Sequence, residues 1–302
     1  MLIDVIIPTF NRMWALPRVT SFYLAMKDVR RVIVVDDAST DGAGDWLGKQ
    51  AALEPRLVPL FHPRNRGASA ARNTGATATE APLVFFADDD MVFQPENGLE
   101  LLMNELRARA ADIVAPIHVL REEDLPAELP AEDYGGNRTP PTLYDERTLE
   151  LRPRRLVATW ALPSSLPTPL AGAWMLMRRE VLAKVRYDEG LGVTSYRDET
   201  DFQLKAAKEG FRLLACARPV MIDLARAHDS GGCHSTSRAE YVVRACRNNW
   251  RILLRHRDTI RERLGIRAPI AYLQACFILR HVGYGLILHE GVRLLRRVGL
   301  RS

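Results

Sequence analysis

Apolar runs alternate with helical stretches over the first 116 residues of the chain. The apolar runs predict strands at 2–7, 32–35, 83–86 and 113–115. Helices are predicted between them, around 14–27, 42–53, 67–79 and 97–110. Buried strands that alternate with helices are typical of a mostly parallel sheet with helices on both faces. We therefore predict an α/β fold for this part of the chain.

Polar residues stand where three of these predicted strands end. The first strand leads into Thr9-Phe10-Asn11-Arg12, the second into Asp36-Asp37, and the third into Asp88-Asp89-Asp90. In open α/β sheets, ligands bind beyond the carboxyl ends of the strands. The sequence therefore predicts a ligand site at this edge of the sheet.

The three consecutive aspartates, Asp88 to Asp90, repel one another in the absence of a counter-ion. A divalent cation would relieve this repulsion, because Mg²⁺ and Mn²⁺ prefer oxygen ligands and bind one or two carboxylates plus substrate phosphates. A solvated acidic turn is the alternative, and Asp36-Asp37 after the neighbouring strand weighs against it. Part of the segment 36–41 also has turn and N-cap chemistry, so it would start the next helix.

A long irregular segment separates these elements from the rest of the chain. Eight of the 18 prolines of the chain lie within residues 118–169, from Pro126 to Pro169. We predict that this segment is an excursion that binds substrate or acts as a lid. Beyond it we predict a strand at 172–177 and a strand pair at 213–217 and 220–224. Helices are predicted at 179–185, at 199–209, and from 238 to the end of the chain.

Composition limits the class of protein. With 302 residues, 47% hydrophobic and 26% charged, the chain can bury a large core, which excludes intrinsic disorder. Its four cysteines form no Cys-x-x-Cys pair, which favours a reducing environment. The first residues lack the basic segment of a signal peptide, so we expect a cytoplasmic protein.

The C-terminal region is basic as well as apolar. Residues 230–302 carry 14 arginines, no lysine and four acidic residues, a balance of +10, whereas the rest of the chain has a balance of −5. Arg280-His281 interrupts the apolar stretch from Pro269 to Leu288, which argues against a membrane-spanning helix. We expect either contact with the inner face of a membrane or a homodimer through these helices, with nucleic acid as the weaker alternative.

The motifs, taken in order, resemble those of family 2 glycosyltransferases. In the first 90 residues they are Ile7-Pro8-Thr9-Phe10-Asn11-Arg12, Val34-Val35-Asp36-Asp37-Ala38-Ser39-Thr40-Asp41, Asn65-Arg66-Gly67, Ala71-Arg72-Asn73-Thr74-Gly75 and Phe85-Phe86-Ala87-Asp88-Asp89-Asp90. Later motifs are Gly172–Arg179, Tyr187-Asp188-Glu189, Asp198-Glu199-Thr200-Asp201-Phe202 and Gly210-Phe211. The resemblance covers about 1–235 and leaves the helical tail outside.

The resemblance implies a GT-A (Rossmann-like) catalytic domain over 1–235, with residues 118–169 on the acceptor side, and a helical extension over 236–302. It implies an inverting transfer, dependent on Mn²⁺ or Mg²⁺, from a nucleoside-diphosphate sugar to the hydroxyl of a glycan, a lipid-linked or a small-molecule acceptor. The residues that would bind the nucleotide sugar are Pro8, Thr9, Asn11, Arg12, Asp37, Gly67, Arg72, Asn73, Asp88, Asp89 and Gly172. Arg72 could instead be a structural ion-pair partner, and Asp89 is expected to turn away from the metal.

The resemblance also implies the metal ligands and the catalytic base. Asp90 would bind the metal, and His228 is either a further ligand or a plain loop histidine. The family commonly has Glu-Asp-x-Asp where this chain has Asp198-Glu199-Thr200-Asp201. Alignment on Asp201 assigns the base to Glu199, with Asp198 as the alternative, and Asp201 would stabilise the start of a helix.

Two other functions compete with glycosyl transfer. A sugar-nucleotide pyrophosphorylase shares the alternating fold and an acidic metal site, but it needs a glycine-rich N-terminal loop that Pro8–Arg12 does not provide. A non-catalytic binding protein on the same fold would be expected to lose the metal and base carboxylates. Both sets of carboxylates are present in this chain.

Overall fold

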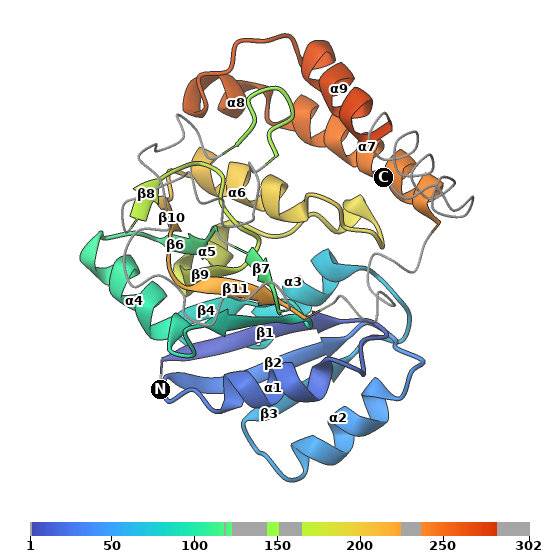
Figure 1. Ribbon diagram of the computed structural model, residues 1–302, viewed down its shortest axis with the longest axis vertical. Helices are drawn as coiled ribbons and strands as arrows, with labels where there is room; N and C mark the ends of the chain where they lie inside the picture. Colours follow the sequence, from blue (N-terminus) through green and yellow to red (C-terminus); the bar gives the residue numbers. More distant parts are fainter. Residues whose placement is uncertain (1, 118, 123–143, 151–164, 225–236, 283–302) are drawn as a thin grey trace, which may run out of the picture.

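The computed structural model describes residues 2–117, 119–122, 144–150, 165–224 and 237–282. Its main feature is an eight-stranded sheet with the order β3-β2-β1-β4-β9-β6-β10-β8 (Figure 1). The strands are β1 (Ile3–Thr9), β2 (Val29–Asp36), β3 (Leu57–Phe61), β4 (Leu83–Phe86), β6 (Ile113–Pro116), β8 (Ser165–Pro167), β9 (Met175–Arg178) and β10 (Leu213–Cys216). β3, β2, β1 and β4 run parallel, as do β6 and β10, while β9 runs antiparallel between β4 and β6.

Helices cover both faces of this sheet, because successive side chains of a strand point to opposite faces. Ile3, Val5 and Ile7 of β1 pack with α1 (Leu16–Leu24), α2 (Ala43–Ala51) and α4 (Gly98–Ala108). Ile6 faces the other way. It packs in the second core with α3 (Ala68–Ala78), α5 (Arg179–Lys184) and α6 (Asp198–Lys208). The mostly parallel α/β sheet with flanking helices is confirmed.

A second, three-stranded sheet has the order β5-β11-β7, formed by β5 (Met91–Gln94), β11 (Val220–Asp223) and β7 (Val119–Arg121). This sheet corrects the prediction that 213–217 and 220–224 pair with each other. β6 and β8 occupy both edges of β10, so β11 pairs with β5 and β7 instead. The segment 118–169 also contains β7 and β8, and its residues 123–143 and 151–164 lie outside the described part.

The C-terminal helices pack next to the helix that carries the predicted base. These are α7 (Arg238–Arg255), α8 (Arg257–Arg263) and α9 (Ile270–Ile278). Figure 1 shows α6 between the large sheet and this group of helices. Within the described residues, no helix has the length and apolar character needed to cross a membrane. The division into 1–235 and 236–302 stays a prediction.

Candidate functional site

The loop after β1 contacts the loop after β2. Asn11, with a positive φ of 54°, donates its backbone N–H to Ser39 Oγ at 2.9 Å. Its side-chain oxygen accepts a hydrogen bond from the backbone N–H of Thr40 at 2.7 Å. Pro8 and Thr9 end β1 and are buried. The structure thus brings the predicted nucleotide-binding segment 8–12 to the carboxyl edge of the sheet.

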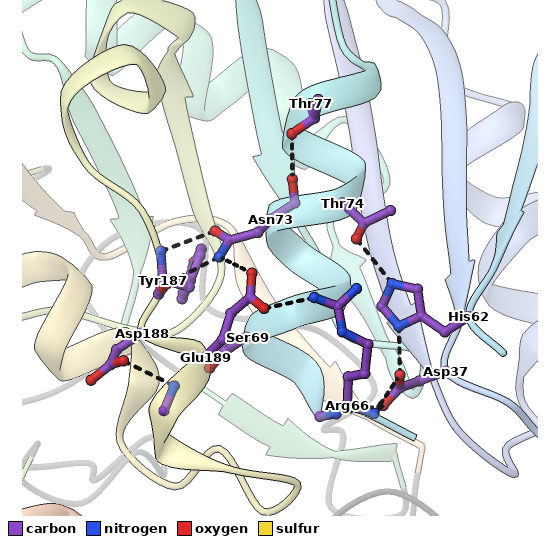
Figure 2. Close-up of polar contacts among 12 residues, drawn as sticks. Asp37, His62, Arg66, Ser69, Asn73, Thr74, Thr77, Tyr187, Asp188 and Glu189 are labelled. Carbon is purple, nitrogen blue, oxygen red and sulfur yellow. Dashed lines mark hydrogen bonds and ion pairs between the residues drawn. The ribbon is translucent and has the colours of Figure 1, made fainter. Parts of the chain in front are cut away.

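Asp37 is buried, and its carboxylate accepts hydrogen bonds from the protein itself (Figure 2). The backbone N–H of Gly67 lies 2.6 Å from Oδ2, the N–H of Arg66 lies 2.9 Å from Oδ1, and His62 Nδ1 lies 2.6 Å from Oδ1. Gly67 has a φ of +89°, and a Cβ there would lie 2.6 Å from the carbonyl oxygen of Gly192. These contacts make Asp37 an anchor for the loop before α3, and its contact with a nucleotide base stays a prediction.

Each of the three consecutive aspartates has a partner from a different element. Thr9 Oγ1 donates to Asp89 at 2.7 Å, and Arg12 pairs with Asp90 at 3.0 Å. Asp88 accepts from Trp174 Nε1 at 2.8 Å and from an arginine of α3. Asp89 is buried and lies against the end of β1, and its orientation relative to a metal stays a prediction.

Burial and mutual repulsion raise the pKa values of two of these carboxyl groups. The pKa of Asp89 rises to about 6, chiefly through burial, although Arg12 opposes the shift. The pKa of Asp90 is raised well above its ordinary value by burial and then by Asp89 and Asp88. Such a group of hard oxygen donors fits a divalent cation, whose charge would offset the repulsion.

The described residues alone do not enclose a metal ion. They contain no group of three or more His, Cys, Asp or Glu side chains arranged to bind one. Mg²⁺ usually binds one or two carboxylates together with substrate phosphates, so a metal site at these aspartates stays a prediction. His228 lies outside the described residues, so its role as a ligand stays a prediction.

Arg72 connects the aspartates with the predicted base. Its Nη2 lies 2.9 Å from Asp88 Oδ1, and its Nη1 lies 2.6 Å from Asp198 Oδ2. Burial by itself would lower the pKa of Arg72, but Asp198 and Asp88 together raise it above its ordinary value. The guanidinium is therefore charged and shared between two carboxylates that are 110 positions apart in the sequence. Arg72 thus makes the ion pairs of the structural alternative, and its contact with a nucleotide stays a prediction.

The two candidate bases have different surroundings. Asp198 is only 3% exposed and also accepts a hydrogen bond from Ser69 Oγ at 3.0 Å. Burial, with Glu199 as a further cause and Arg72 opposing, raises the pKa of Asp198 to about 7. Glu199 is half-buried and lines a cavity. Of the two, Glu199 is the carboxylate that a substrate can reach.

Asn73 and Gly172 serve packing in the described structure. Asn73 Nδ2 donates to the carbonyl oxygen of Tyr187 and to Glu189, while its Oδ1 accepts from the N–H of Tyr187, each at 3.0 Å (Figure 2). A Cβ at Gly172 would lie 2.2 Å from the carbonyl oxygen of Pro116. Contact of either residue with a nucleotide sugar stays a prediction.

Sequence reasoning missed three side chains of this site: His62, Ser69 and Trp174. Ser69 could have been found, because it lies three positions before Arg72 and therefore shares its face of α3. Trp174 and His62 carried no local signal. Their partners, Asp88 and Asp37, are 86 and 25 positions away in the sequence.

Asp201 of α6 confirms the structural role expected for it. Its carboxylate is fully buried and contacts Lys205 at 2.6 Å, His256 at 2.8 Å and Arg255 at 2.9 Å. Although burial opposes the shift, hydrogen bonds from His256 and Lys205 lower the pKa of Asp201 to about 2. These contacts join α6 to the C-terminal helices.

Asp201→Asn is expected to lower the free energy of unfolding at pH 7 by about 3 kcal/mol, because it removes the buried carboxylate that pairs with Lys205 and Arg255 and contacts His256. A carboxyl group with a lowered folded-state pKa stabilises the protein above its unfolded pKa, and this stabilisation is lost as the pH falls to about 2. Urea unfolding between about pH 5 and pH 2 should therefore show a weaker pH dependence in the variant. Asp258→Asn, at an exposed aspartate of α8, is the control. Equal unfolding curves for both variants would contradict this account.

Comparison with known proteins identifies the fold and the family of this chain. Residues 4–186, more than half of the chain, match the family described as Glycosyl transferase family 2. A pre-mycofactocin glycosyltransferase of Mycobacterium tuberculosis is 34% identical over 38% of this chain and 23% of its own length. An undecaprenyl-phosphate mannosyltransferase of Micrococcus luteus is 33% identical over 36% of this chain and 45% of its own length. This chain thus matches less than half of the length of these two relatives.

Among solved structures, the S. aureus TarS fragment 1–349 in complex with UDP-GlcNAc shares the fold. Its TM-score is 0.54 at 16% sequence identity, and the similarity covers 94% of this chain and 73% of that chain. The fold is therefore of the GT-A type, as predicted, with the C-terminal helices included in the similarity. The family match contains the segments 8–12 and 88–90 and ends before Glu199. Together these findings show that the chain belongs to glycosyl transferase family 2.

Proposed function

We propose that this chain is a metal-dependent, inverting glycosyltransferase that moves a sugar from a nucleoside-diphosphate sugar to an acceptor hydroxyl. One observation carries the proposal. Arg72 joins a buried aspartate group at the end of β4 to the carboxylates that begin α6, with ion-pair distances of 2.9 and 2.6 Å. Two acidic groups at one edge of the sheet supply the two functions that the reaction needs, a metal site and a base.

The donor would bind at the carboxyl ends of β1, β2 and β4. Segment 8–12 and Asp88 lie at this edge, where α/β sheets bind nucleotides. The similarity to TarS, which has been solved with UDP-GlcNAc, supports a uridine nucleotide sugar as the first donor to test. Family membership favours transfer over the nucleotidyltransferase and the non-catalytic alternatives.

Asp90, with His228 as a second candidate, would hold Mn²⁺ or Mg²⁺ together with the diphosphate of the donor. When bound, the ion would neutralise the charge that develops on the departing nucleoside diphosphate. Arg12 holds the Asp90 carboxylate from the side of β1 at 3.0 Å. Arg72 and Trp174 hold Asp88 in the same way.

Glu199 would remove the proton from the acceptor hydroxyl as this oxygen attacks the anomeric carbon. Asp198 holds the start of α6 in place through Arg72 and Ser69. Attack from the face opposite the leaving diphosphate inverts the anomeric centre. The mechanism therefore assigns Glu199 to chemistry and Asp198 to positioning.

A panel of nucleotide sugars, each with and without Mn²⁺, tests the proposal by thermal shift. The correct donor should raise the melting temperature, since a ligand at 100 times its Kd stabilises the folded state by about 2.7 kcal/mol. The shift should require the metal and should be followed by slow release of the nucleoside diphosphate. If none of the nucleotide sugars stabilised the protein in the presence of Mn²⁺, the proposed function would be wrong.

A cytoplasmic location, with the C-terminal helices on the inner face of a membrane or in a homodimer, belongs to the same proposal. Exposed apolar side chains support it: Trp250 and Leu254 on α7, and Tyr272 and Leu279 at α9. Arginines stand between them along the sequence. Such a mixture of apolar and basic residues is typical of interfacial helices.

A further inference from the structure

A cavity of about 320 Å³ lies where the start of α6 meets the C-terminal helices. Glu199 lines it together with Arg197, two positions earlier in the sequence, and Thr200. The lining also contains Glu150 from the segment 144–150 and Arg280, which follows α9. The volume is at the low end of the range of small-molecule sites, which begins at about 300 Å³. Arg280 and Glu199 lie beyond the part of the chain that matches the family model, whereas Glu150 lies within it.

The part of the lining around Glu150 is held by a polar network. Glu150 Oε1 accepts a hydrogen bond from Tyr196 Oη at 3.0 Å and lies 2.9 Å from His281 Nε2. Arg280 Nε lies 3.2 Å from Glu150 Oε2. Although burial opposes the shift, His281 and then Arg197 and Arg280 lower the pKa of Glu150 to about 2. Glu150 is therefore a carboxylate at neutral pH.

Arg197 connects the segment 144–150 with the start of α6, which carries the predicted base. Its buried guanidinium donates to the carbonyl oxygens of Thr148 and Leu149, at 2.9 and 2.8 Å, and to the side chain of Asn249. Arg197 directly precedes Asp198 and Glu199 in the sequence. One side chain thus holds the segment that carries Glu150 against the start of the helix that carries Glu199.

We propose that this cavity is the acceptor subsite, and that Glu150 and Arg280 select a neutral, hydroxyl-bearing acceptor such as a sugar. The inference rests on the proposed transfer reaction, because it takes Glu199 as the base. The acceptor O–H gives its proton to Glu199, its oxygen forms the new bond to the anomeric carbon, and the bond from that carbon to the diphosphate breaks, with the electron pair leaving on the nucleoside diphosphate.

The charges of the lining support a neutral acceptor. Two carboxylates, Glu150 and Glu199, face two guanidinium groups, Arg197 and Arg280, so the cavity offers no excess positive charge to a phosphate. A hydroxyl group donates one hydrogen bond and accepts others. Neighbouring carboxylate and guanidinium groups match this pattern, since the carboxylate accepts a hydrogen bond and the guanidinium donates one.

The test uses the full chain, the donor found by thermal shift, and two kinds of acceptor probe. The first is a panel of neutral p-nitrophenyl glycosides, and the second is undecaprenyl phosphate, the substrate named for the Micrococcus luteus relative. Glu150→Gln should raise the ratio of acceptor KM to donor KM about 10- to 100-fold, the range for one hydrogen bond to a charged group. Arg280→Lys should also raise the ratio of acceptor KM to donor KM. Because the side chain of Arg280 is half-exposed, this variant should fold.

Glu146→Gln is the matched control, since this exposed glutamate lies in the same segment four positions before Glu150. It should leave the ratio of the two KM values unchanged. An unchanged ratio in both Glu150→Gln and Arg280→Lys, with transfer intact, would overturn the subsite, and so would transfer to undecaprenyl phosphate without transfer to any neutral glycoside. Failure of the unaltered chain to release nucleoside diphosphate from any donor would instead overturn the proposed function, and the subsite with it.

Discussion

Glu199→Gln is expected to lower the rate of transfer about 10²–10⁴-fold, because glutamine keeps the size of the side chain but cannot accept the acceptor proton. Binding of donor and metal should persist, since Glu199 makes no contact with the aspartates at the end of β4 among the contacts described. The measurement is kcat from nucleoside diphosphate release, together with donor affinity by calorimetry. The loss corresponds to roughly 3–5 kcal/mol of activation free energy.

Asp198→Asn is the comparison that separates the two candidate bases. Asp198 is buried against Arg72, so this variant should lose mainly stability, by about 3–5 kcal/mol for breaking a buried pair. Its kcat, measured below its melting temperature, should fall less than that of Glu199→Gln. An inactive but stable Asp198→Asn beside an active Glu199→Gln would assign the base to Asp198. NMR of the product tests the mechanism separately, because one base and in-line attack require an inverted anomer.

Asp90→Asn is expected to lower transfer by at least about 10²-fold, since an interaction with a catalytic metal contributes several kcal/mol to the transition state. The amide keeps the shape of the carboxylate but loses the charge that would bind the cation. Affinity for UDP should then become nearly independent of Mn²⁺, as measured by calorimetry with and without the metal.

Asp89→Asn is the matched control for this experiment. Its carboxylate accepts from Thr9 Oγ1 inside the protein, and an asparagine oxygen can accept the same hydrogen bond. Transfer and its metal dependence should therefore change much less than in Asp90→Asn. Normal turnover of Asp90→Asn in the presence of a chelator would exclude a metal-dependent reaction.

The main strands could be predicted from the sequence because they are buried apolar runs. β1, for example, is buried over its whole length and ends at Thr9. β3 was missed, because it is an edge strand of five residues with Pro59 inside it and only Leu57 fully buried. The pairing of β10 with β11 was wrong because sequence adjacency suggests a hairpin, whereas the pairing depends on which edges other strands already occupy.

The sequence could predict at which edge of the sheet the site lies, because the order and direction of the strands determine that edge. Thr9, Asp37 and Asp88 follow parallel strands, so their common edge could be inferred. Which atoms they contact could not, because the partners come from distant segments. The buried pair of Arg72 with Asp198 joins residues 126 positions apart, and no local pattern encodes that distance.

The contacts of Asp201 bear on how this chain could have evolved by recombination. Asp201 lies beyond the end of the family match, and two of its three partners, Arg255 and His256, come from the C-terminal helices. If residues 1–235 were exchanged without those helices, the buried acid would keep only Lys205 of these three partners. We therefore expect recombination between α6 and the C-terminal helices to be tolerated only where Asp201, Arg255 and His256 are exchanged or replaced together.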